Sequence, residues 1–203
     1  MTRYGGHRGD ALRRTLAVEA ARLMAEHGIE DYGLAKRKAA ERYGTFEGTV
    51  LPSNAEIEAA LQEHLRLFES DTHGDTLAAL RHAAVGAMEL LAEFSPRLVG
   101  PVLLGTATRN AEVQLHLFAD RPEAVTIRLL DTDVPHELVE RRVKMRTDDW
   151  VLTPAVRFTL DDVDIDALVF DRDGQRQAPL SPTDGRPMRR ATIDEVRALL
   201  EEY

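Results

Sequence analysis

The chain contains no cysteine, and this absence removes several kinds of chemistry at once. A protein without cysteine has no disulfide, no cysteine-ligated zinc or iron–sulfur site and no thiol nucleophile. No stretch approaches the roughly 18 consecutive apolar residues that a membrane-spanning helix needs. The polar N-terminus, with Arg3 and Arg8, has no apolar segment behind it that would make it a signal peptide. We therefore expect a cytoplasmic protein that does not cross a membrane.

Positive charge is scarce overall: 26 Lys and Arg face 35 Asp and Glu in 203 residues, a net charge of -9. This balance argues against a protein that coats nucleic acid through phosphate contacts. The distribution is uneven, because residues 1–42 carry 9 basic and 6 acidic side chains whereas residues 43–95 carry 2 and 9. One basic helix face is expected in the first segment, either solvated or in contact with RNA or a protein partner. Its residues are Lys36, Arg37, Lys38 and Arg42.

Apolar residues at helical spacing predict about four helices in the N-terminal half. They are expected to begin near residues 10, 32, 54 and 75. Capping residues and breaks mark their ends. The first helix is expected to lie between Asp10 and Gly28, and the second between Asp31 and Gly44. Ser53 or Asn54 caps the third, a break at 71–74 precedes the fourth, and Ser95-Pro96 ends it.

After Pro96 the hydrophobic period changes from that of a helix to that of a strand. Strands are expected over residues 98–104, 113–118, 136–145, 154–160 and 163–170. Asp161-Asp162 is expected to form a tight antiparallel turn, and Asp120 to cap a helix that runs to about residue 131. Thr192 and Glu195 form a capping box for a final helix. The pattern predicts an α+β protein, with an N-terminal helical region over 1–74 and an α/β domain over 75–203.

A glycine turn stands at a fixed distance before an acidic position at the start of a strand. Gly100-Pro101 is followed by ten residues and then by Glu112-Val113-Gln114, with an inner Gly105-Thr106 between them. This spacing resembles the Gly-Ser, ten residues, Asp-x-Asp signature of the polymerase-beta-like nucleotidyltransferase superfamily, in a divergent form. The resemblance covers roughly residues 76–170 and implies a nucleotidyltransferase-like mixed sheet with flanking helices.

The resemblance implies metal-dependent nucleotidyl transfer, in which carboxylates hold two divalent ions against a triphosphate. It places Glu112, Gln114 and Asp166 at the catalytic positions and implies Mg²⁺ or Mn²⁺ as the cofactor. Pro101 lacks the family's hydroxyl and an amide donor, and Gln114 is neutral where the family has a carboxylate. We therefore expect a catalytically degenerate or atypical member that binds a nucleotide or another small phosphorylated ligand. A non-catalytic module that binds RNA or protein is the alternative.

Phosphate contacts are expected at two places. The resemblance implies Gly100, Gly105 and Thr106 at the turn. The segment 171–190, rich in proline, glycine and arginine, is expected to form a long loop over the pocket. Either Arg186 or Arg189 would meet the anionic ligand there, unless these arginines form salt bridges instead.

Two further readings of the sequence remain open. Residues alternate along a strand, so Glu112 and His116 share a face that Asp164 or Asp166 can join from the last strand, and this set suits one metal ion, Zn²⁺ or Mn²⁺. The same face could instead be an ordinary solvent-exposed strand face. Residues 20–50 are also similar to the start of a Tet-repressor-type helix-turn-helix, although Gly48 and Pro52 would interrupt its recognition helix. The similarity makes a DNA-binding regulator the third hypothesis.

Overall fold

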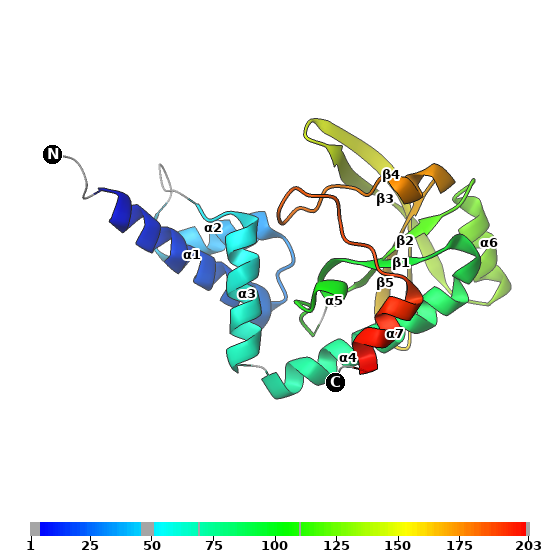
Figure 1. Ribbon diagram of the computed structural model, residues 1–203, viewed down its shortest axis with the longest axis horizontal. Helices are drawn as coiled ribbons and strands as arrows, with labels where there is room; N and C mark the ends of the chain where they lie inside the picture. Colours follow the sequence, from blue (N-terminus) through cyan, green and yellow to red (C-terminus); the bar gives the residue numbers. More distant parts are fainter. Residues whose placement is uncertain (1–4, 46–50, 69, 110, 202–203) are drawn as a thin grey trace. The chain divides into compact units, whose positions relative to one another are not determined.

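The computed structural model of the protein describes residues 5–45, 51–68, 70–109 and 111–201 (Figure 1). The chain divides into two compact units. The first contains the described residues up to His73, with Thr108, Arg109 and the short segment Pro182–Asp184. The second contains Gly74–Ala107, Ala111–Ser181 and the described residues from Gly185 onward.

The first unit is built from three helices, which begin near where the apolar spacing predicts them. They are α1 (Gly5–His27), α2 (Tyr32–Arg42) and α3 (Asn54–Phe68). Small and aliphatic side chains from all three form one core, with Leu16, Ala20 and Ile57 fully buried. The alanines let the helices approach closely, so a unit of this size still packs a continuous apolar centre.

Capping residues explain where these helices begin. The side chain of Asp31 accepts a hydrogen bond from the backbone N–H of Leu34, which confirms its predicted N-cap role. Ser53 and Glu56 exchange side-chain to backbone hydrogen bonds in a capping box before α3. Asp10 was the wrong choice for the first helix, because α1 begins at Gly5 and Asp10 lies inside it.

The second unit contains a five-stranded mixed sheet in the order β1-β2-β5-β4-β3. The strands are β1 (Arg97–Val99), β2 (Val113–Phe118), β3 (His136–Arg146), β4 (Asp149–Leu160) and β5 (Val163–Phe170). Only β2 and β5 pair in parallel; the other neighbours are antiparallel. The α+β class is therefore confirmed, with helices first and a mixed sheet after them.

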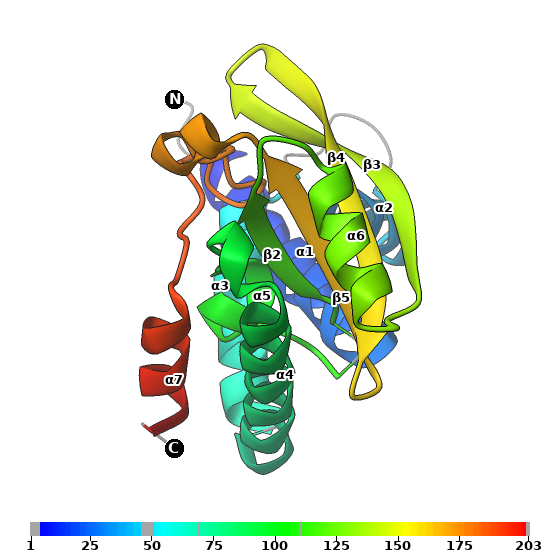
Figure 2. The same ribbon diagram turned by 90° about the vertical axis from the view of Figure 1, so that its right-hand side faces the viewer.

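Helices cover one face of this sheet (Figure 2). They are α4 (Ser70–Leu90), α5 (Gly100–Leu104), α6 (Glu123–Asp131) and α7 (Ile193–Glu201). The unit also contains short 3-10 turns at Ala92–Phe94 and Arg172–Arg176. Alternate residues of the central strands, such as Leu115, Leu117 and Ile165, join helix residues in the main core. The opposite face carries polar side chains and a smaller apolar cluster around Phe118 and Phe170.

Three predicted boundaries in this unit were wrong. The break expected at 71–74 does not occur, because α4 runs through Gly74; one glycine costs a helix about 1 kcal/mol, which packing can outweigh. The strand expected over 98–104 stops at Val99, where Gly100 adopts a positive φ of 72° and Pro101 begins the short helix α5. Asp120 does not cap α6, which begins at Glu123; it pairs instead with Arg172.

Two other local predictions are confirmed. Asp161 and Asp162 both have positive φ, at 50° and 62°, as a tight two-residue hairpin turn between β4 and β5 requires. Thr192 and Glu195 form the expected capping box at the start of α7. Among the described residues, no helix is long and apolar enough to cross a membrane.

Candidate functional site

The sheet brings two of the motif residues, Gln114 of β2 and Asp166 of β5, onto its polar face. In the parallel pairing of these strands, Gln114 stands directly beside Asp166. On the other side of β5, Arg157 of β4 stands beside the same aspartate. Because directly paired residues point to one face of a sheet, these three side chains share the polar face. Glu112 lies one residue before β2 and reaches the same region.

Each acidic residue of this group is paired with an arginine. Glu112 accepts a hydrogen bond from Arg157, and Asp166 accepts one from Arg141 of β3 at 2.9 Å. The Asp166 side chain is 9% exposed and the Arg141 side chain 35% exposed. Arg141, beside Asp166, has its pKa raised, chiefly by that hydrogen bond. We call these two ion pairs, with Gln114, the paired-charge face.

Gly100 packs directly against this face. Its positive φ places it in a conformation that side chains other than glycine rarely adopt. A Cβ atom at this position would collide with the side-chain amide of Gln114. The predicted glycine turn and the strand position fourteen residues later are therefore in contact, at the start of α5.

His116 lies on the same face but is enclosed. It is 2% exposed, and its Nδ1 accepts a hydrogen bond of 3.0 Å from the Nε of Arg190. Burial, helped by the charge of Arg190, lowers the pKa of His116 to about 3, so the ring is neutral at physiological pH. Arg190 in turn lies over the rings of Phe118 and Phe170, and its Nη1 donates to the carbonyl of Gly174.

The residues of the predicted metal site do not fit a divalent ion. Glu112 and Asp166 each hold a guanidinium, Gln114 is neutral, and Asp164 accepts a hydrogen bond from Thr159. His116 uses Nδ1 to bind Arg190. Over the residues that the structure describes, no three histidine, aspartate or glutamate side chains converge as metal ligands. Hard divalent cations need several convergent oxygen ligands, which this arrangement commits to arginines instead.

The predicted phosphate-binding residues are only partly brought together. Gly100 lies beside Gln114, but Gly105 and Thr106 stand at the other end of α5, where both of their backbone N–H groups donate to the carbonyl of Pro101. Arg186 and Arg189 are exposed in the long segment after β5, and it is Arg190 that turns inward. The contacts predicted for Gly105, Thr106, Arg186 and Arg189 remain predictions.

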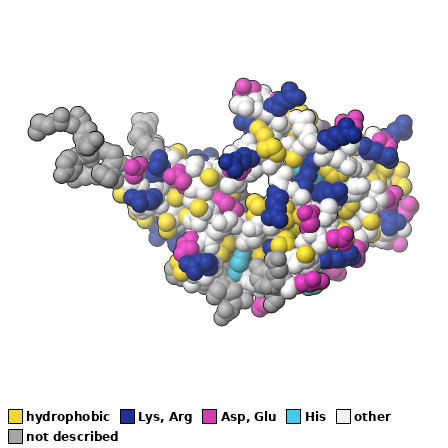
Figure 3. All heavy atoms as spheres, in the orientation of Figure 1, with side chains coloured by type: hydrophobic (Ala, Val, Ile, Leu, Met, Phe, Trp, Pro, Cys, Tyr) yellow, Lys and Arg dark blue, Asp and Glu magenta, His cyan; other side chains and the backbone are white. Residues whose placement is uncertain are grey.

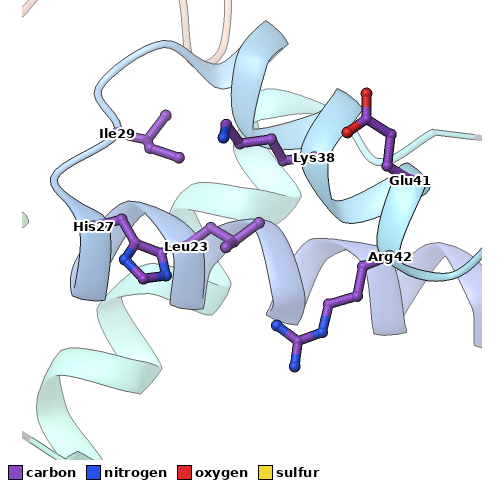
Figure 4. A pocket seen from close by; sticks show the side chains of 6 residues that line it. All are labelled: Leu23, His27, Ile29, Lys38, Glu41 and Arg42. Carbon is purple, nitrogen blue, oxygen red and sulfur yellow. The ribbon is translucent and has the colours of Figure 1, made fainter.

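The basic side chains of α2 do not form one continuous face. Lys38 and Arg42, one turn apart, border an open pocket of about 540 Å³ in the first unit (Figure 4). Arg42 also pairs with Glu19 at 3.2 Å. Lys36 is half-buried, and this burial lowers its pKa; only Arg37 and Lys38 stand well exposed beside Arg42. A contact with RNA or protein here remains a prediction. Gly48, which would interrupt the recognition helix of the helix-turn-helix hypothesis, lies outside the described residues.

The contacts of three arginines were not predicted from the sequence: Arg141, Arg157 and, in the long loop, Arg190. The position of Arg157 could have been predicted, because a two-residue turn at Asp161-Asp162 fixes the register that places Arg157 opposite Asp166. Arg141 depends on the longer β3–β4 pairing, which contains an irregularity near Lys144 and could not be counted from the sequence. Comparisons of the sequence with protein-family models and with curated proteins find no match.

Proposed function

We propose that this chain is a divergent nucleotidyltransferase-like protein that binds a nucleotide or another small phosphorylated ligand at the paired-charge face without a metal clamp. The observation that carries the proposal is the position of Arg141 and Arg157. They stand on the acidic residues that the family resemblance assigns to metal ions. The guanidinium groups supply positive charge where the family uses divalent cations.

Both arginines have N–H donors that their carboxylate partners do not use. Arg141 reaches Asp166 through Nε, and within the described residues its two Nη nitrogens have no acceptor. Arg157 reaches Glu112 through Nη2, and its side chain is 38% exposed. A guanidinium has five N–H donors, so each arginine can hold its carboxylate and still bind a phosphate oxygen.

The carboxylate of Asp166 favours a ligand that carries a hydroxyl or amino group in addition to phosphate. Its Oδ2 is bound by Arg141, whereas its Oδ1 is buried and has no hydrogen-bond partner among the described residues. A buried carboxylate oxygen without a donor is costly, and a ligand O–H or N–H would satisfy it. Phosphate together with a hydroxyl or amino group is the chemistry of a nucleotide or a sugar phosphate.

Calorimetric titration tests this proposal. The full chain is titrated with ATP, GTP, CTP, UTP and pyrophosphate, once in EDTA and once in Mg²⁺. We expect saturable binding in EDTA, changed only severalfold by Mg²⁺ and weakened in Arg157→Gln. Arg172→Gln is the matched control, because Arg172 is also an ion-paired arginine of the second unit. Binding only in Mg²⁺, or no binding of any of these ligands, would overturn the proposal.

A further inference from the structure

The β3–β4 hairpin extends beyond the rest of the sheet. β5 pairs with β4 only over Ala155–Leu160, so the part of β4 before residue 155 has β3 as its neighbour on one side alone. Figure 2 shows this end of the hairpin projecting past α6. Nearer the centre of the sheet, helices cover the side chains on one face. In the projecting part of the hairpin, side chains on the same face are exposed.

One face of the projecting part combines apolar and basic side chains. Lys144 is paired with Trp150, and Arg142 with Leu152, so all four point to the same side. Nearer the sheet, this face continues into the buried core residues Val156 and Phe158. At the projecting end Trp150 is 50% exposed and Leu152 62% exposed. We call these four residues the tryptophan face. Figure 3 shows hydrophobic, basic and acidic side chains near this end of the hairpin.

The two cations of the tryptophan face lie against the indole ring. The guanidinium carbon of Arg142 is 4.8 Å from the ring centroid and the Nζ of Lys144 is 5.8 Å from it. Within the part of the chain that the structure describes, neither of them forms an ion pair. Glu140 is the acidic residue that shares this side of β3, so the cations outnumber it.

We propose that the tryptophan face binds single-stranded nucleic acid. An exposed aromatic ring provides a stacking surface for an unpaired base, and adjacent cations follow the phosphate backbone. Two cations without carboxylate partners favour an anionic occupant over an apolar one. Arg142, already stacked on the ring, extends the surface on which a base can stack. This site is separate from the paired-charge face and rests on different residues.

Tryptophan fluorescence gives a direct readout, because Trp150 is the single tryptophan of the chain. The full-length protein is titrated with a single-stranded oligouridylate of about twelve nucleotides at low salt. We expect saturable quenching that weakens as salt is added, since bound phosphates release counterions. The double variant Arg142→Gln/Lys144→Gln should bind at least about tenfold more weakly. The matched control, Arg172→Gln/Arg176→Gln, removes two exposed arginines elsewhere in the unit and should bind like the wild type.

Two further measurements make the test decisive. In anisotropy titrations with labelled oligouridylate, Trp150→Phe should keep most of the binding, whereas Trp150→Ala should lose it while unfolding at the wild-type temperature. Polyglutamate of similar length should not quench. Absence of saturable quenching, unchanged affinity in the Arg142/Lys144 variant, or equal quenching by polyglutamate would overturn the proposal. The last outcome would indicate a general polyanion surface, such as one for an acidic protein.

Discussion

The paired-charge face contains an arginine that is ion-paired, whereas the tryptophan face contains one without an ion pair in the described part of the chain. The two arginines, Arg141 and Arg142, are neighbours in β3. Arg141 points to one side of β3 and binds the buried carboxylate of Asp166. Arg142, the next residue, points to the other side and lies against Trp150, with no ion pair among the described residues. Strand alternation alone separates the two environments.

The surroundings of each arginine determine what its charge can do. An arginine that neutralises a buried carboxylate is needed by the fold even when its remaining N–H groups bind a ligand, because removing it leaves an unpaired charge inside the protein. An exposed arginine without a carboxylate partner contributes little to stability and remains available to a ligand. The two faces should therefore respond differently to the same substitution, to pH and to metal ions.

Neutralising the two neighbouring arginines gives the largest expected difference. Arg141→Gln should lower the free energy of unfolding by about 2–3 kcal/mol, because Asp166 loses its cation, with some relief because Arg141 is partly exposed. Arg142→Gln should cost only about 0.5 kcal/mol, the size of an exposed cation–π contact. Urea unfolding followed by far-UV circular dichroism measures both values. Equal losses in the two variants would contradict the distinction between the faces.

Acid should destabilise the sheet through His116. In the folded protein the pKa of His116 is lowered to about 3, whereas the unfolded chain takes up a proton near the ordinary value of 6.5. Between these values the unfolded state binds more protons, so stability falls as the pH falls. From pH 7 to pH 5 this histidine should remove about 2 kcal/mol from the free energy of unfolding.

The variant His116→Gln isolates this effect. Glutamine keeps an acceptor for Arg190 but does not titrate, so its free energy of unfolding should fall less than that of the wild type between pH 7 and pH 5. Urea unfolding at the two pH values measures the difference. The same loss in both proteins would mean that the enclosed imidazole does not govern the acid sensitivity of this face.

The sequence predicted much of the fold because the relevant signals are local. Alternation predicted β2 with its observed ends, Asp31 and the Thr192 capping box predicted helix starts, and Asp161-Asp162 predicted the hairpin turn. The errors arose where packing or backbone geometry overrode a local signal. The break expected at 71–74 did not delay the start of α4, which already includes Gly74. The apolar run after Leu98 became the helix α5, because the positive φ of Gly100 ends the strand.

The sequence brought together part of the candidate site but not its pairing of acidic residues with arginines. Spacing indicated Gly100 and Gln114, and the family resemblance indicated Asp166. The structure places Gly100 against Gln114, and Gln114 in direct register with Asp166. Spacing gave no indication of Arg141, because a partner from a distant strand becomes visible only when the register is known. The enclosure of His116 was missed for the same kind of reason, since Arg190 reaches it from 74 positions further along the chain.

Mn²⁺ binding tests most directly whether Glu112 and Asp166 hold arginines or a metal ion. Electron paramagnetic resonance measures free Mn²⁺ as the purified full-length protein is added. We expect no loss of the free Mn²⁺ signal at submillimolar concentrations, in the wild type and equally in Glu112→Gln and the control Glu137→Gln. Stoichiometric Mn²⁺ binding by the wild type that Glu112→Gln abolishes and Glu137→Gln retains would contradict it.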